Sequence, residues 1–246
     1  MRFCAVIPTY NNCKTVCDVA KKTLNYVESV YVVNDGSTDE TASLLSDLSV
    51  RGNGIKIVTL KENCGKGKAL AAGFAAAFAD GYSYAVTLDS DGQHFASDIQ
   101  GMLAKVSDTR PTLVCGVRNI TTQENMPSKN TFANEFSNFW FKVETGMEIP
   151  DTQCGFRVYP LKEITQRRIF SSRYEAELEM MVRLVWAGVE IQTSPIKVYY
   201  APEGERVTHF RPFADFFRIS LMNTALCAGA LLYYWPKKML RYVFGR

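Results

Sequence analysis

Two aspartates one residue apart, Asp89 and Asp91, are the strongest chemical signal in this sequence. They close an apolar run over residues 84–89, and Gln93 follows them. Carboxylate and amide oxygens are the ligands that Mg²⁺ and Mn²⁺ prefer, whereas zinc prefers nitrogen and sulfur. A divalent cation held here would neutralise the charge that develops on a leaving diphosphate. An Asx-rich turn is the alternative interpretation, and we expect a structural role for His94.

Another carboxylate, Asp35, ends a second apolar run in the segment NDGSTD at residues 34–39. A carboxylate there can accept hydrogen bonds from the N–H groups of a uracil or guanine edge. The residues from Ser37 onwards read as a helix N-cap, which leaves Asp35 unexplained. The segment PTYNN at residues 8–12 closes the first apolar run, where the backbone could edge a nucleobase and Tyr10 could stack on it.

Glycine and lysine alternate after the third apolar run, in the segment GKGK at residues 65–68. The segment opens a helical pattern, so backbone N–H groups, the lysine charges and the helix dipole all suit a phosphate. The spacing G-x-x-x-x-G-K-[ST] is absent, which excludes a Walker A loop. A flexible turn is the alternative.

These motifs follow short apolar runs that alternate with helical patterns, the signature of βαβ units and a mostly parallel sheet. We expect strands over residues 3–7, 29–34, 55–60, 84–89 and 112–116, with helices over residues 13–24, 38–51 and 66–79. Further along, the pattern predicts helices over residues 128–145 and 175–187 and strands over residues 189–193 and 196–200. Ligands of open α/β sheets collect beyond the carboxyl ends of the strands, so the motifs should meet at one edge.

Length and composition favour one α/β catalytic body with a C-terminal extension. The 246 residues are 47% hydrophobic, enough to bury a large core. A balance of 28 Lys and Arg against 25 Asp and Glu, net charge +3, excludes the dense basic pattern of a nucleic-acid-binding protein. Seven cysteines without a Cys-x-x-Cys pair favour a reduced compartment. The apolar run at the N-terminus is too short for a signal-peptide core, so we expect a cytoplasmic protein.

In this order and spacing, PTYN, NDGSTD, NCGKG and DSDGQH resemble the motifs of glycosyltransferase family 2. The segment DTQCGFR at residues 151–157 resembles the acceptor-side motif of the dolichol-phosphate mannosyltransferase and polyprenyl-phosphate glycosyltransferase subgroup. The resemblance implies a GT-A fold, with a Rossmann-like, mostly parallel central sheet flanked by helices. It also implies a metal-dependent enzyme that transfers a sugar from a UDP- or GDP-sugar with inversion at the anomeric carbon.

The resemblance assigns site residues by position. The donor-binding residues it implies are Pro8, Tyr10, Asn11, Asp35, Lys66 or Lys68, and Asp89. The residues implied for Mg²⁺ or Mn²⁺ are Asp89, Asp91 and Gln93. Those implied for the acceptor and phosphate side are Arg118, Lys129, Gln153 and Arg157. Lys129 departs from the arginine usual in the family, and a lysine cannot make the same bidentate phosphate contact.

Two glutamates, Glu177 and Glu179, stand where the subgroup often has Asp-x-Glu. Because they also lie in the helical pattern over residues 175–187, a solvated helix face is the alternative interpretation.

The expected acceptor is a polyprenyl phosphate, which is already anionic and needs no general base. If the acceptor were the hydroxyl of a glycolipid or saccharide, a carboxylate would have to take its proton, and Asp151 is the candidate catalytic base by position. A nucleotidyltransferase is a rival reading, but such enzymes usually carry a Gly-rich, cationic loop where this chain has PTYN. A non-catalytic nucleotide-sugar-binding protein is a further rival, disfavoured by the presence of both Asp89 and Asp91.

We expect two parts in the chain, a catalytic domain over residues 1–205 and an aromatic, basic helical tail over residues 206–246. The apolar stretch over residues 219–235 is marginal for crossing a bilayer. Tyr233, Tyr234 and Trp235 precede several cations and read as a peripheral anchor on the cytoplasmic face of a membrane. A helix pair that completes the core is the alternative.

Overall fold

A computed structural model describes residues 1–51, 54–118, 128–199 and 212–244. Within them, seven strands form one sheet in the order β3-β2-β1-β4-β6-β5-β7. All neighbouring strands are parallel except β6, which is antiparallel to both β4 and β5. The strands are β1 (Phe3–Thr9), β2 (Val30–Asn34), β3 (Ile55–Thr59), β4 (Tyr84–Thr87), β5 (Thr112–Arg118), β6 (Arg157–Pro160) and β7 (Glu190–Ile196).

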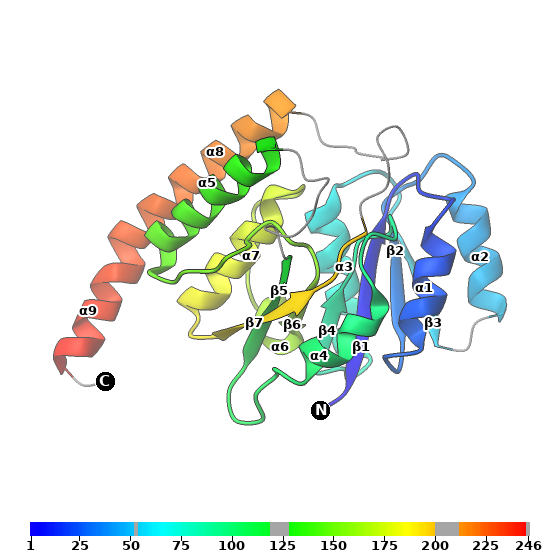
Figure 1. Ribbon diagram of the computed structural model, residues 1–246, viewed down its shortest axis with the longest axis horizontal. Coiled ribbons are helices and arrows are strands. Elements are labelled where there is room, and N and C mark those ends of the chain that lie inside the picture. The colour runs from blue at the N-terminus through cyan, green and yellow to red at the C-terminus, as the bar shows by residue number, and fades with distance from the viewer. Residues whose placement is uncertain (52–53, 119–127, 200–211, 245–246) are drawn as a thin grey trace.

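Helices cover both faces of this sheet (Figure 1). On one face lie α1 (Val16–Leu24), α2 (Thr41–Arg51), the short η1 (Ala96–Asp98) and α4 (Ile99–Leu103). On the other face lie α3 (Lys66–Ala79), α6 (Leu161–Thr165) and α7 (Glu175–Trp186), and α5 (Ser128–Thr145) packs outside α7. The expected fold class, a mostly parallel sheet flanked by helices, is confirmed.

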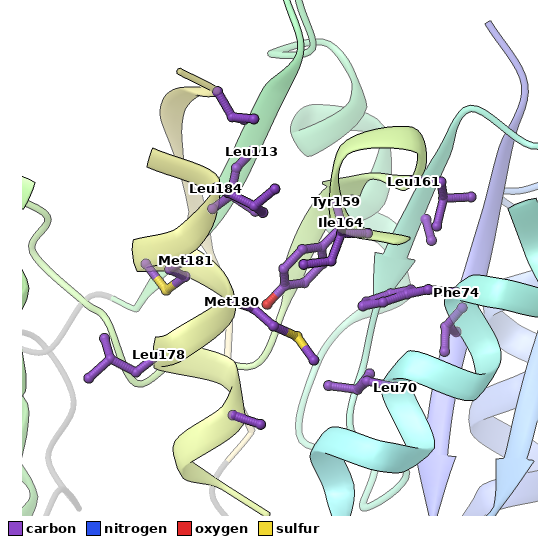
Figure 2. Close-up of a cluster of buried hydrophobic side chains, with 14 of the residues drawn as sticks. Leu70, Phe74, Leu113, Tyr159, Leu161, Ile164, Leu178, Met180, Met181 and Leu184 are labelled. Carbon is purple, nitrogen blue, oxygen red and sulfur yellow. The ribbon is translucent and has the colours of Figure 1, made fainter. Parts of the chain in front are cut away.

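The apolar core between α3 and α7 sets the position of the two helices. Leu70 and Phe74 of α3 face Met180 of α7 across Tyr159 of β6 (Figure 2). The rings of Phe74 and Tyr159 lie 5.0 Å apart between centroids. Because both helices begin at the same edge of the sheet, this packing brings Lys66, the first residue of α3, close to Glu177 in the first turn of α7.

The C-terminal segment is a continuous helical rod made of α8 (Pro212–Gly229), a π-helical turn η2 (Ala230–Tyr234) and α9 (Trp235–Phe244). It lies beside α5 and extends past the end of the sheet (Figure 1). Met222, Leu226 and Ala230 of the rod are buried against the body. The part of the chain described here contains no helix with the length and hydropathy needed to span a bilayer.

Aromatic side chains attach this rod to the last turn of α5. The last carbonyls of a helix have no partner inside the helix. Here the indole N–H of Trp235 donates to the backbone carbonyl of Val143 at 3.3 Å. The hydroxyl of Tyr234 donates to the backbone carbonyl of Thr145, also at 3.3 Å. Tyr234 and Trp235 therefore pack on the body, whereas the sequence reading placed both in a membrane anchor.

Candidate active site

A cavity of about 250 Å³ opens at the carboxyl ends of β1, β2 and β4. The end of β1, the loop after β2, the start of α3, the turn after β4 and the segment before α7 all contribute to its wall. The lining residues are Pro8, Thr9, Tyr10, Asn12, Asp35, Asn63, Gly65, Lys66, Ala69, Asp89, Ser90, Asp91, Arg173 and Tyr174. The four motifs singled out in the sequence thus meet at one edge of the sheet.

The paired carboxylates lie in the turn after β4 and have different electrostatic surroundings. Burial raises the pKa of Asp89, but the charge and hydrogen bond of Lys66, together with the charges of His94 and Arg157, outweigh it and lower that pKa to about 2. Burial and the charge of Asp89 raise the pKa of Asp91 to about 6. The backbone N–H of Gln93 donates to Asp91 Oδ1 at 3.0 Å. The pair therefore presents one firmly ionised carboxylate beside a second that additional positive charge would keep ionised.

These residues fit a hard divalent cation, because carboxylate oxygens suit Mg²⁺ and Mn²⁺ and the repulsion between them is relieved by positive charge. The residues described include no cluster of three or more His, Cys, Asp or Glu side chains that could form a complete metal cage. Mg²⁺ is commonly bound by one or two carboxylates plus the phosphates of a substrate. Gln93 is not among the residues that line the cavity. The pair Asp89 and Asp91 is accordingly the protein's candidate contribution to a metal site.

Lys66, the first residue of α3, lies between the carboxylates of Asp89 and Glu177. Its Nζ is 2.6 Å from Asp89 Oδ1 and 2.7 Å from Glu177 Oε2. Burial lowers its pKa, but the charges of Asp89 and Glu177 raise it more, so Lys66 stays charged. The preceding Gly65 has φ 95°, a conformation that a side chain would disfavour. This glycine lets the chain turn into α3 and places the lysine beside the acidic pair.

Gly155 allows this charged cluster to pack closely. A Cβ atom built on Gly155 would lie 3.0 Å from Asp89 Oδ2 and 3.0 Å from Lys66 Nζ. It would also lie 3.2 Å from Glu177 Oε1. The absence of a side chain at Gly155 thus belongs to the geometry of the site.

Arg157 is 1% exposed and does not face the cavity, in contrast to the expected contact with phosphates. Its guanidinium donates to the hydroxyl of Tyr159 at 2.9 Å and to the carbonyl of Thr152 at 2.8 Å, and lies 3.5 Å from Glu177 Oε1. Arg157 begins β6, a strand buried in the middle of the sheet, which keeps its side chain beneath the surface. Arg157 therefore pairs with Glu177 from the buried side of the site.

The carboxylate of Asp35 holds the loop that leads into α3. Its two oxygens accept hydrogen bonds from the backbone N–H groups of Cys64 and Gly65, both at 2.8 Å. Burial raises the pKa of Asp35, while these hydrogen bonds and the charge of Arg173 act in the opposite direction. Asp35 also lines the cavity, so it both holds the loop that leads into α3 and faces the cavity.

Pro8 and Tyr10 line the cavity as expected, but Asn11 does not. Asn11 has φ 48°, and its side-chain oxygen accepts a hydrogen bond from the backbone N–H of Thr38 at 2.8 Å. Its backbone N–H donates to Ser37 Oγ at 3.0 Å. Asn11 therefore joins the loop after β1 to the loop after β2 and supports the pocket from outside.

Lys68 does not line the cavity that contains Asp89 and Asp91, so Lys66 is the residue of the pair that reaches the acidic cluster. Residues i and i+2 of a helix do not share a face. Lys68 lines a separate cavity of about 250 Å³ with Arg167, Arg168 and Met180, on the far side of the segment before α7.

Asp151 is fully buried, which changes the role expected for it. Both of its oxygens accept hydrogen bonds from the guanidinium of Arg118, and the backbone N–H of Gln153 adds another at 3.2 Å. With its oxygens engaged in this way, Asp151 orients Arg118 and does not have the exposure a general base requires. Gln153 donates through its side chain to the carbonyl of Ala133 at 3.1 Å. The side chain of Lys129 lies outside the described residues.

Glu179 is buried, and a solvated helix face is wrong for it and for Glu177. Its carboxylate accepts hydrogen bonds from the backbone N–H groups of Phe170 and Ser171 and pairs with Arg183 at 2.6 Å. Glu179 therefore fixes the segment before α7.

His94 packs against Phe156 with ring centroids 5.1 Å apart, in line with a structural role.

Sequence reasoning missed Arg173 and Tyr174, which complete the cavity wall from the segment before α7. They lie far along the chain from the other motifs and match no short pattern. Arg173 lies close to Gly65 because α7 packs on α3, which only the folded chain reveals.

A cavity lined by paired carboxylates at the carboxyl edge of a mostly parallel sheet is the arrangement expected of a GT-A transferase. The chain belongs to glycosyltransferase family 2, whose model, described as Glycosyl transferase family 2, matches residues 4–164. The chain is therefore a glycosyltransferase, and the nucleotidyltransferase reading falls away.

Relatives of this chain agree with the resemblance to the polyprenyl-phosphate subgroup. It is 26% identical over 212 residues to UDP-N-acetylglucosamine–dolichyl-phosphate N-acetylglucosaminyltransferase of Methanococcus voltae, covering 79% of this chain and 84% of the relative. It is 27% identical over 203 residues to polyprenol monophosphomannose synthase of Mycolicibacterium smegmatis, with 79% and 76% covered.

Solved structures share the fold at low sequence identity. Glucosyl-3-phosphoglycerate synthase of Mycobacterium tuberculosis matches with a TM-score of 0.69 and 16% identity, over 92% of this chain and 80% of that chain. Mannosyl-3-phosphoglycerate synthase of Rubrobacter xylanophilus matches with a TM-score of 0.63 and 16% identity, over 100% and 76%. These similarities establish the GT-A fold.

Proposed function

We propose that this protein transfers a sugar, with inversion at the anomeric carbon, from a UDP- or GDP-sugar to a polyprenyl phosphate at a membrane surface. The observation that carries the proposal is the pair Asp89 and Asp91 in the wall of a cavity of about 250 Å³ at the carboxyl edge of the sheet. One relative is named for transfer to dolichyl phosphate and another for the synthesis of polyprenol monophosphomannose, and both names support the choice of acceptor.

In this proposal the donor lies along the cavity. The nucleobase lies by Tyr10 and Asp35, and the diphosphate lies by Asp89 and Asp91 with Mg²⁺ or Mn²⁺. A bound cation would supply charge neutralisation for the leaving diphosphate. Lys66, held 2.6 Å from Asp89, adds a fixed positive charge on the same side.

The chemical step requires no protein nucleophile. An oxygen of the acceptor phosphate attacks the anomeric carbon from the face opposite the diphosphate, and the bond to the diphosphate oxygen breaks as the new bond forms. The acceptor is already an anion, so no proton has to be removed. Arg118 is the candidate for the acceptor phosphate, because Asp151 fixes its guanidinium at the end of β5.

The geometry favours a phosphate acceptor over a hydroxyl acceptor. A hydroxyl must lose a proton, and the expected base, Asp151, is buried and paired with Arg118. A phosphate acceptor removes this requirement. Glycolipid or saccharide acceptors are therefore the less well supported alternative.

The C-terminal rod supplies the proposed membrane contact, on the cytoplasmic face. Its outward side is apolar, with Leu232 83% and Tyr242 92% exposed. The other exposed apolar residues of the rod are Phe217, Leu221, Leu231, Tyr233, Met239, Leu240 and Phe244. Lys237, Lys238 and Arg241 lie among them, a combination that suits the interface of an anionic bilayer.

Transfer can be tested by incubating the protein with radiolabelled UDP- and GDP-sugars, Mn²⁺ and undecaprenyl phosphate in detergent. We expect a labelled, acid-labile lipid product. Undecaprenol, which has the same chain without the phosphate, is the matched control and should accept no sugar. Transfer to undecaprenol or to a glycolipid, with none to the phosphate, would overturn the acceptor assignment.

A further inference from the structure

A second cavity, separate from the donor cavity, opens between α3, α6 and the segment that joins α6 to α7. Its volume is about 250 Å³. Its inner wall is apolar, because the lining residues Phe74, Ile164 and Met180 are only 1%, 3% and 1% exposed. The exposed Ala71 and Ala75 of α3 line the outer part, where their small side chains leave the space unfilled. An apolar group that entered this cavity would be removed from water.

Three cations line the same cavity, namely Lys68 of α3 and Arg167 and Arg168 after α6. All three residues are exposed. In the part of the chain that the structure describes, no Asp or Glu lines the cavity, and none of these cations forms an ion pair. Cations without carboxylate partners, set around an apolar wall, suit a ligand that joins an anionic group to an apolar one.

An exposed aromatic residue, Phe170, stands at the rim of the second cavity, between the lining residues Ile169 and Ser171. Phe170 is 62% exposed. The guanidinium of Arg168 lies 4.8 Å from the centroid of its ring, and the guanidinium of Arg183 lies 4.9 Å from it. Because exposed aromatic rings beside cations bind at the headgroup level of a bilayer, this rim favours a lipid over a soluble ligand.

The rim also lies near the C-terminal rod. The pKa of the Tyr233 hydroxyl is lowered, first by its hydrogen bond with Lys237 and then by the charges of Lys237, Arg241 and Arg167. Arg167 is therefore close enough to Tyr233 for its charge to act on the rod, which is the proposed membrane contact. A lipid in the second cavity would belong to the same bilayer surface that the rod contacts.

We propose that the second cavity binds an anionic phospholipid, with the lipid phosphate between Lys68, Arg167 and Arg168 and the first carbons of an acyl chain against the apolar wall. This inference goes beyond the proposed sugar transfer, because none of the three cations lines the donor cavity. It also differs from the general attraction of a basic surface to a bilayer. Diffuse attraction needs only charge, whereas a cavity also needs space for the apolar part of the lipid.

The inference can be tested with dihexanoyl phosphatidylglycerol, used below its critical micelle concentration, by isothermal titration calorimetry. Glycerol 3-phosphate supplies a phosphate without acyl chains, and dihexanoyl phosphatidylcholine supplies the chains without net charge. Wild type should bind the phosphatidylglycerol roughly tenfold more tightly than either of the other two. Equal binding of glycerol 3-phosphate would identify a site for free phosphate and overturn the lipid assignment. No binding of phosphatidylglycerol would overturn the site itself.

Removal of the cations locates the phosphate. The triple variant Lys68→Gln, Arg167→Gln and Arg168→Gln should bind dihexanoyl phosphatidylglycerol roughly a hundredfold more weakly than wild type. A control variant removes the same charge from exposed lysines near α1 and α4, on the other face of the sheet, and should bind as wild type does; its changes are Lys14→Gln, Lys21→Gln and Lys105→Gln. Equal weakening in the two triple variants would show that only net charge matters.

Filling the cavity separates it from diffuse surface charge. Ala71→Leu keeps every cation and adds a larger side chain where the acyl carbons would lie, so binding should weaken by roughly tenfold. Ala42→Leu, at an exposed position of α2, is the matched control and should change nothing. Thermal melts report whether each variant is folded, and both alanines lie outside the core. Unchanged binding in Ala71→Leu would overturn the cavity as the site of the lipid.

Discussion

Both carboxylate oxygens of Asp151 accept hydrogen bonds from the guanidinium of Arg118, at 2.6 and 2.8 Å. This bidentate pair lies at the end of β5, with Asp151 fully buried and the side chain of Arg118 18% exposed. The carboxylate is fully buried, whereas the side chain of Arg118 keeps a small exposed surface. This pairing supports the proposal that Arg118 binds the acceptor phosphate.

We therefore predict that Asp151→Asn impairs acceptor binding more than it changes the chemistry. The variant loses a charge that orients Arg118, so the KM for undecaprenyl phosphate should rise by roughly tenfold. The pH profile of kcat should keep its shape, because no proton transfer is lost. Steady-state kinetics over a pH series measure both. A kcat that falls by orders of magnitude and recovers at high pH would instead identify Asp151 as a base.

Gly155→Ala should lower transfer while the protein stays folded. The added methyl would enter a space where Asp89 Oδ2 and Lys66 Nζ lie 3.0 Å away, and the charged cluster would have to shift. A misplacement of about 1 Å can cost roughly a hundredfold in rate, so a smaller shift of the cluster should lower the rate by roughly severalfold to tenfold. Gly101→Ala in α4 is the matched control, because its new Cβ would meet Ser194 Oγ only at 4.0 Å. Equal activity of the two variants would contradict the importance of this close contact.

We predict that Glu144 makes the stability of the protein depend on pH. It is fully buried between α5 and the C-terminal rod, with Cys227 Sγ 3.9 Å from Oε1. Burial raises its pKa to about 8 from an ordinary value of 4.5. Since the folded pKa is the higher one, the stabilisation from the bound proton is complete below about pH 4.5 and is lost as the pH rises through about 8.

Glu144→Gln should remove this dependence. Relative to wild type, the variant should gain on the order of a few kcal/mol in the free energy of unfolding between pH 5 and pH 9. Urea denaturation at each pH measures the difference. Glu148→Gln, which alters an exposed carboxylate paired with Lys142, serves as the control and should show no comparable gain. Parallel pH curves for wild type and Glu144→Gln would disprove the effect.

Charge on the outward face of the rod should release the protein from membranes. Leu232→Glu with Tyr242→Glu places two carboxylates among exposed apolar residues, where they oppose insertion into an anionic interface. Co-sedimentation with vesicles containing phosphatidylglycerol should fall by roughly fivefold. Phe78→Glu, on α3 and 42% exposed, is a control that should bind as wild type does. Equal binding of all three proteins would remove the membrane assignment.

The sequence predicted the sheet well where periodicity and motif order agree. It missed β6, because Arg157–Pro160 reads as part of a turn-rich stretch although this strand is buried between β4 and β5. It divided β7 into two strands around Pro195, which an edge strand tolerates because one side of its backbone needs no partner. Local composition alone does not reveal which strand lies at an edge.

The candidate site was predictable in part. The positions of Asp89, Asp91, Asp35 and Lys66 follow from strand ends, which share one edge in a parallel sheet. The partners of charged side chains do not follow from position. Arg157 and Asp151 were read as site groups, yet tertiary packing buries both. Arg173 lines the cavity because of the packing between helices, which no sequence motif predicts.

The most direct test of the account is the binding of Mn²⁺ and UDP or GDP to the wild type and to Asp91→Asn, followed by calorimetry. We predict that the wild type binds nucleotide tightly only with Mn²⁺ and that Asp91→Asn loses this metal-dependent binding. The melting temperature of Asp91→Asn should not fall, because the raised pKa of Asp91 marks a carboxylate that is costly to keep charged. Nucleotide binding that is the same with and without Mn²⁺, and unchanged in Asp91→Asn, would contradict it.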